Sequence, residues 1–140
     1  MNEGAGGSRE LTSVRWCLIA GALSAAIGVA LGAFGAHGLR VLLSPESMAI
    51  FETGVRYQMY HAGALIAVGF AGQIVDGRST RRLSFAGWSF VAGTALFSGS
   101  LYAMSLTGLR ALGAITPAGG ILFLVGWMLF IYSLLNHRSG

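Results

Sequence analysis

The hydrophobic positions of this chain fall into long uncharged runs separated by short polar segments. Residues 16–36 contain 21 consecutive residues without a formal charge. As a helix they would measure about 32 Å, which matches the roughly 30 Å hydrocarbon thickness of a bilayer. A second uncharged run follows Arg56, and we place a second span at residues 57–75. Arg110 is the only charged residue from Leu83 to Leu135, a stretch too long for one crossing, so we predict two further spans at about 83–106 and 117–135.

Two short motifs predict where helices begin. Ser44-Pro45-Glu46 combines an N-cap, a proline in the first turn and an acid near the positive helix end. Thr116-Pro117 repeats the cap and proline before the last span. After residue 45, apolar residues recur at helical spacing at Met48, Phe51, Val55 and Met59. We therefore predict a short interfacial helix between spans one and two, with a bend near Gly54.

These elements predict an all-α fold, an integral membrane four-helix bundle. Residues 1–15 are expected to form a mobile polar tail, and residues 16–136 the four-span domain. Four crossings put both chain ends on one side of the membrane. Arginines 9, 15, 78, 81, 82 and 138 share that side, against 40, 56 and 110 on the other. The positive-inside rule then predicts that both termini are cytoplasmic, and arginine without lysine favours a bacterial inner (plasma) membrane.

Composition and charge exclude several other classes of protein. The chain is 54% apolar and 10% charged, whereas an ordinary soluble domain carries about 25% charge. The basic residues do not gather along an aromatic-studded face, so nucleic-acid binding is not expected. A lone Cys17 allows neither an internal disulfide nor a thiol redox pair.

Small residues recur along one face of the first span. They are Gly21, Ala25, Gly28, Gly32 and Gly35. Helices in lipid associate where small side chains let their backbones approach closely. This face is either a dimer seam or a packing surface within the bundle, and the need of three other spans for partners favours the second.

Polar residues of three spans are expected to meet in the outer half of the membrane. This candidate polar cluster contains His37, Tyr57, His61, Ser98, Tyr102, Ser105 and Thr116. Hydroxyl groups in a span are expected to face the bundle, where His61 would accept a hydrogen bond from Tyr102 or Ser98. We favour a structural histidine over a haem or metal ligand or a proton relay.

Four ordered motifs resemble one known family. They cover residues 32–39, 57–62, 97–102 and 116–120, the last followed by Gly126-Trp127. The chain from about residue 16 to 135 is similar to the domain of unknown function 423 family, which includes the eukaryotic transmembrane protein 256. The resemblance implies four helical spans and an uncharacterised activity. It singles out as motif positions His37, His61, Ser98, Tyr102, Thr116 and Pro117.

The sequence thus predicts an integral membrane protein of uncharacterised activity, expected to be a non-enzymatic structural or accessory component. No serine-histidine-acid set, carboxylate pair or phosphate loop is visible, and no cofactor is expected. The alternative is a small transporter or channel with a polar site in the outer half of the membrane. The expected partners are the lipid bilayer and either further copies of the chain or a larger membrane complex.

Overall fold

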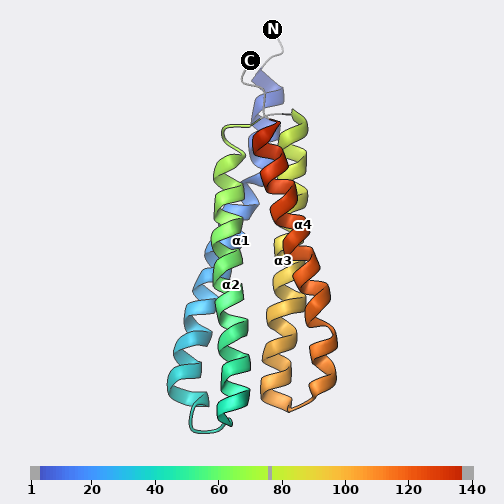
Figure 1. The fold of residues 1–140 in the computed structure, drawn as a ribbon. Coiled ribbons are helices and arrows are strands. Elements are labelled where there is room, and N and C mark those ends of the chain that lie inside the picture. Colours follow the sequence, from blue (N-terminus) through green and yellow to red (C-terminus); the bar gives the residue numbers. More distant parts are fainter. Residues whose placement is uncertain (1–3, 76, 137–140) are drawn as a thin grey trace.

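The computed structural model describes residues 4–75 and 77–136, and within these residues it is helical with short connections. The elements are α1 (Gly4–Phe34), the π-helical turn η1 (Gly35–Leu39), α2 (Pro45–Ala71), α3 (Gly77–Thr107), the 3₁₀ turn η2 (Arg110–Ala114) and α4 (Thr116–Leu135). Four long helices run side by side (Figure 1). The start of α1, the α2–α3 connection and the end of α4 lie at one end of the bundle, as an even number of crossings requires.

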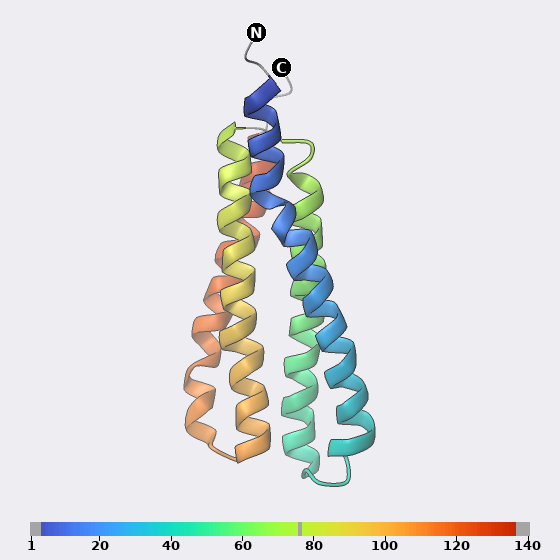
Figure 2. The ribbon, with the colours of Figure 1, turned by 180° about the vertical axis from the view of Figure 1, so that it is seen from behind.

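Three of the helical segments are long and apolar enough to cross a membrane. They are Val14–Leu39, Arg78–Thr107 and Arg110–Leu135. Helix α2 is more polar, but it runs antiparallel to α1 along the bundle (Figure 2). Its 27 residues correspond to about 40 Å of helix, enough to cross the same thickness. The fold therefore agrees with the predicted count of four helices.

The first helix begins earlier than predicted, and its α-helical part ends at Phe34, two residues before the predicted end of the span at residue 36. It begins at Gly4, so residues 4–15, predicted as part of a mobile tail, are helical. Val14 is only 1% exposed and packs in the main core, which gives the helix a reason to begin before the uncharged run. Beyond Phe34 the chain continues in helical turns to Leu39. Residues 1–3 and Arg138 lie outside the described part of the chain.

The structure does not confirm a separate interfacial helix before the second span. Helix α2 begins at Pro45 as predicted, and the hydroxyl of Ser44 accepts the Ser47 N–H at 3.2 Å. It then continues without interruption to Ala71, short of the predicted end at residue 75. Met48 and Phe51 are buried in a small core with Leu39 instead of facing lipid headgroups.

Gly54 makes room for a neighbouring side chain within this continuous helix. A Cβ atom built at Gly54 would lie 2.8 Å from the ring of Tyr102 on α3. Close packing against Tyr102 therefore accounts for a glycine at this position, and the bend expected there stays a prediction.

The connection between α3 and α4 is short and lies at one end of the bundle (Figure 1). Gly108 adopts a φ of 73°, the left-handed conformation that ends many helices. The following turn, η2, has no buried residue. Arg110 lies 3.6 Å from Glu46, but both side chains are exposed, so this ion pair adds little stability.

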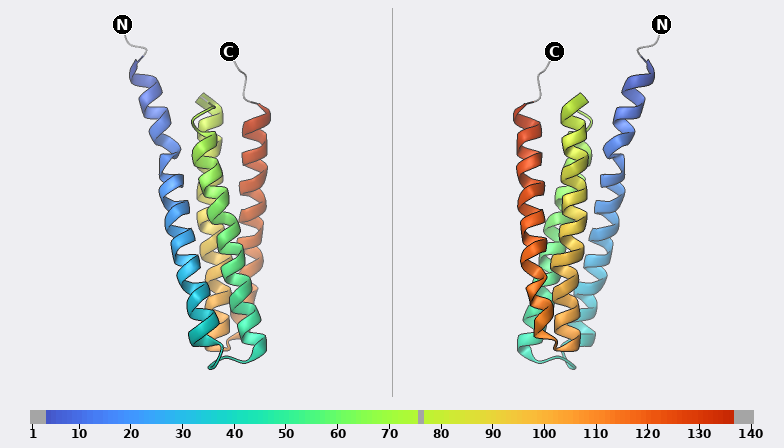
Figure 3. Two further views of the ribbon diagram at one scale, coloured as in Figure 1. Left: turned by 90° about the vertical axis from the view of Figure 1, so that its left-hand side faces the viewer. Right: turned by 90° about the vertical axis from the view of Figure 1, so that its right-hand side faces the viewer.

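The bundle consists of two hairpins, α1–α2 and α3–α4, joined along α2 and α3. Helices α1 and α4 do not touch, and they lie on opposite sides of the central pair (Figure 3). Glycines mark the closest approaches. A Cβ at Gly119 of α4 would come within 2.5 Å of the Phe97 backbone nitrogen and 2.9 Å of the Gly93 oxygen.

The small-residue face of α1 packs against α2. A Cβ at Gly21 would lie 2.8 Å from the Ala62 carbonyl oxygen. Cβ atoms at the next glycines along α1 would meet side chains of Met59, Val55 and Met48 in turn, at Gly28, Gly32 and Gly35. Ala25 is half-buried between them. This face lies inside the monomer, the arrangement favoured over a dimer seam.

Candidate functional site

A hydrogen-bonded network links three helices of the bundle. It is built on Gln58, the middle residue of α2, whose side chain is 6% exposed. Its Nε2 donates to the Ser24 carbonyl of α1 at 2.9 Å, and its Oε1 accepts the Tyr102 hydroxyl of α3 at 2.8 Å. One amide therefore links three helices. Such bonds contribute about 0.6 to 2 kcal/mol each in membrane bundles.

Helix α3 carries two further buried hydroxyl groups. The side-chain oxygens of Thr94 and Ser98 are buried, and neither has a hydrogen-bond partner within the described residues. Thr94, Gln58 and Tyr102 also line a groove of about 460 Å³ at the junction of α1, α2 and α3. The network therefore borders unfilled space on one side.

His61 faces away from this network, contrary to the prediction that it bonds Tyr102 or Ser98. Its Nδ1 lies 2.8 Å from the Tyr57 carbonyl oxygen. Because a carbonyl can only accept, Nδ1 carries the proton in this bond. The imidazole ring stacks on Phe123 of α4, with ring centroids 3.4 Å apart and planes 4° apart. Gln58, one turn earlier, takes the hydrogen-bonding place that was expected for His61.

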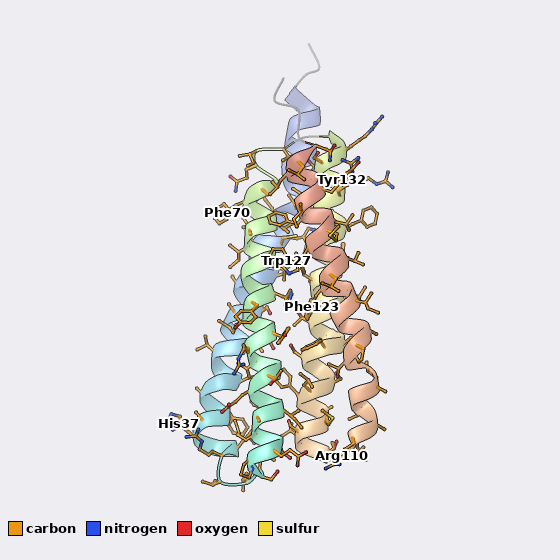
Figure 4. The ribbon with its side chains drawn as sticks, viewed as in Figure 1. His37, Phe70, Arg110, Phe123, Trp127 and Tyr132 are labelled. Atoms are coloured by element: carbon orange, nitrogen blue, oxygen red, sulfur yellow. The ribbon has the colours of Figure 1, made fainter. Side chains whose placement is uncertain are left out.

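The space beside His61 forms a groove between α2 and α4, the α2/α4 groove. Its volume is about 780 Å³. It is lined by Tyr57, Tyr60 and His61 of α2, Phe97 of α3, and Pro117, Gly120, Ile121, Phe123, Leu124 and Trp127 of α4. Phe123 and Trp127 lie at successive turns of α4 on the side toward α2 (Figure 4). No lining residue carries a fixed charge.

The predicted polar cluster is therefore divided among separate places. Tyr57 and His61 belong to the α2/α4 groove, and Tyr102 belongs to the Gln58 network. Thr116 pairs with Ser100 at 2.7 Å, and the Ser105 hydroxyl donates to the Tyr102 carbonyl. His37 is exposed in η1, just beyond α1, and joins none of these groups (Figure 4).

The members of the network lie at different heights along their helices. Gln58 is at the midpoint of α2, whereas Tyr102 lies near the Thr107 end of α3. The placement of the polar groups in the outer half of the membrane stays a prediction. Sequence reasoning missed Gln58, although an amide among the apolar residues of a span is itself an indication of an intramembrane hydrogen bond.

Metal-ligating side chains do not gather in the described part of the chain. No group of three histidine, cysteine or acidic residues there is close enough to hold an ion. The ring of His61 is surrounded by the aromatic rings of Phe90, Phe123 and Trp127. What the arrangement offers is hydrogen bonding and ring stacking in an apolar setting.

Taken together, the apolar helices and the interior polar network define an integral membrane helical bundle. A profile of the family described as "Protein of unknown function (DUF423)" matches residues 31–120, and the chain belongs to this family. Among its relatives, a UPF0382 membrane protein of Staphylococcus haemolyticus is 47% identical over 83% of this chain and 92% of its own. The UPF0382 membrane protein YwdK of Bacillus subtilis is 42% identical over 86% of this chain and 96% of its own. No solved structure gives a significant match.

The Gln58 network yields a test by double-mutant cycle. Tyr102→Phe removes the hydroxyl that donates to Gln58, and Gln58→Leu removes its acceptor. We expect each single variant to destabilise the bundle and the pair to show a coupling energy of about 0.5 to 2 kcal/mol, because the second loss finds the bond already broken. Unfolding of the purified protein in mixed micelles measures it. Strictly additive losses would mean that the bond contributes nothing.

Proposed function

We propose that this protein is a non-enzymatic structural or accessory component of the bacterial cell membrane. The observation that carries the proposal is the use made of the interior polar groups. Gln58, Tyr102 and Ser100 each bond to a residue on another helix. Groups engaged in this way hold helices together and are not free to act on a substrate.

The outer faces of the bundle support an accessory role. Helix α4 packs almost wholly on α3, and α1 does not reach it. Large apolar side chains are exposed along both outer helices, among them Ile19, Leu23, Ile121 and Leu124. Lipid covers such faces in a monomer, whereas further copies of the chain or other membrane proteins would cover them in a complex.

A small transporter is the second candidate, and one observation favours it. The buried hydroxyls of Thr94 and Ser98 are unpartnered within the described residues, and Thr94 borders the groove of about 460 Å³ beside Gln58. Polar groups within a span often line transport paths. A path would also need polar groups toward both ends of the bundle, and the residues that line this groove are mainly apolar.

The two candidates predict different behaviour after extraction from cell membranes. We expect an affinity-tagged chain, solubilised in mild detergent, to elute as an assembly larger than its monomer and of constant stoichiometry. A tagged four-span protein of unrelated sequence is the control for mixed micelles. A monomer that lets small solutes across reconstituted vesicles would overturn the accessory proposal in favour of transport.

We further propose that both termini face the cytoplasm. The observation that supports this orientation is the excess of arginines toward the α2–α3 connection and chain ends, including Arg78, Arg81 and Arg82. Arg82 lies 4.7 Å from the centroid of the Tyr132 ring, at the end of the bundle where α3 begins and α4 ends.

Reporter fusions test this orientation. We expect alkaline phosphatase to be active when inserted in the connection near Val41 and inactive when fused after the last residue, because the enzyme folds only outside the cytoplasm. Green fluorescent protein at the same two sites is the reciprocal control. Phosphatase activity at the chain's end, with none near Val41, would reverse the proposed orientation.

A further inference from the structure

The α2/α4 groove combines an apolar lining with a few polar atoms at one place. Ile121, Leu124 and Pro117 supply aliphatic walls. The polar atoms of its lining side chains belong to His61, Tyr57, Tyr60 and the indole of Trp127. A ligand that fits this groove is therefore mostly hydrocarbon and carries a small hydrogen-bonding group.

Three of the aromatic rings beside the groove, those of Tyr57, His61 and Phe123, lie nearly parallel to one another, whereas Tyr60 is at 62° to Tyr57 and Trp127 is at 58° to His61. The planes of Tyr57 and His61 are 19° apart, and those of Tyr57 and Phe123 are 22° apart. Tyr57 also stacks on Phe97 at a centroid distance of 4.5 Å. Aligned ring faces of this kind favour a planar ring as the next member of the stack.

One nitrogen of His61 is available to a ligand. Its Nδ1–H is held by the Tyr57 carbonyl, so in the neutral ring the other nitrogen, Nε2, is an acceptor. No protein group within the described residues donates to it, and the His61 side chain lines the groove. The matching ligand group is a donor such as a hydroxyl.

The depth of His61 excludes a charged headgroup. It lies one turn beyond the midpoint of α2, close to the centre of the bundle. Phosphate and other charged groups of lipids remain at the membrane surface because burying a charge in hydrocarbon is costly. The ligand group near His61 must therefore be uncharged.

We propose that the α2/α4 groove binds an uncharged membrane lipid of the phenol or quinol type, a planar hydroxyl-bearing ring joined to a hydrocarbon tail. The hydroxyl donates to His61 Nε2, the ring stacks beside Tyr57, and the tail follows Ile121 and Leu124 toward the bilayer. This inference goes beyond the accessory role, which requires no ligand, and either one can fail without the other.

The test uses 4-decylphenol, which has the ring, hydroxyl and tail and is stable to air. Trp127 lines the groove, so Trp16→Phe and Trp88→Phe make its fluorescence the reporter. In lipid nanodiscs that contain the full chain, we expect a saturable change in Trp127 emission. Decylbenzene, which lacks the hydroxyl, and decanol, which lacks the ring, should each bind about tenfold more weakly.

Glycine variants locate the binding site. A Cβ at Gly120 would lie 3.9 Å from Phe97, an ordinary contact, so Gly120→Leu should fold and fill the groove. Gly63 has no atom within 4 Å of its Cβ position, is exposed and does not line the groove, so Gly63→Leu is the matched control. We expect saturable binding to be lost in the first variant and kept in the second.

His61→Phe tests the hydrogen bond without emptying the stack. We expect 4-decylphenol to bind about tenfold more weakly to this variant, with decylbenzene unchanged. Equal binding of 4-decylphenol and decylbenzene to the native chain would contradict the hydrogen bond to His61. Equal binding of 4-decylphenol and decanol would contradict the stacking of a ring beside Tyr57. Full binding to Gly120→Leu, or no saturable binding to the native chain, would overturn the site.

Discussion

The close approach of helix backbones at glycine is the constraint on which the rest of this fold depends. Lipid gives helices no hydrophobic reason to associate, so the bundle relies on contacts that become possible when side chains are absent. Gly21 brings α1 onto the backbone of α2 at Ala62, and Gly119 brings α4 onto α3 at Gly93. Each contact sets the distance between the two helices of one hairpin, and the larger side chains pack at that distance.

The contrast between glycine contacts and aromatic contacts explains why a groove remains. Where Gly119 meets Gly93, α4 lies against the α3 backbone. Between α2 and α4 the facing residues are His61 and Phe123, whose stacked rings stand in place of small side chains. Helix α4 therefore lies closer to α3 than to α2. The space left between them is the α2/α4 groove.

Two polar side chains on neighbouring turns of α2, Gln58 and His61, have different roles. Gln58 satisfies both halves of its amide on neighbouring helices and so joins α1, α2 and α3. His61, one turn later, satisfies one nitrogen on its own backbone and directs its ring toward α4. The amide of Gln58 is fully used in bonds between helices. The ring of His61 uses only Nδ1, and its Nε2 has no partner among the described residues.

Sequence patterns predict the spans well and the facing of individual residues less well. Uncharged runs and the Ser44-Pro45 and Thr116-Pro117 motifs predict α4 and the start of α2 to within a residue, because length and capping are local properties. The early start of α1 depends on the burial of Val14, which is a tertiary contact.

The hydrogen bond between Gln58 and Tyr102 could not be predicted from the sequence for the same reason, because it depends on how the helices face one another. Gln58 and His61 differ by about 60° around α2, a difference smaller than the uncertainty in how a helix is rotated when only its sequence is known. The prediction therefore assigned the bond with Tyr102 to His61, where the structure has Gln58.

The most direct measurement of the central claim compares the free energy of unfolding of Gly119→Ala with that of Gly63→Ala. Both variants add one methyl group to a helix, but only at Gly119 does it meet backbone atoms of a neighbouring helix. The account predicts that Gly119→Ala loses about 1 to 3 kcal/mol and that Gly63→Ala loses nothing. Equal stability of the two variants would contradict the claim that glycine contact holds this bundle together.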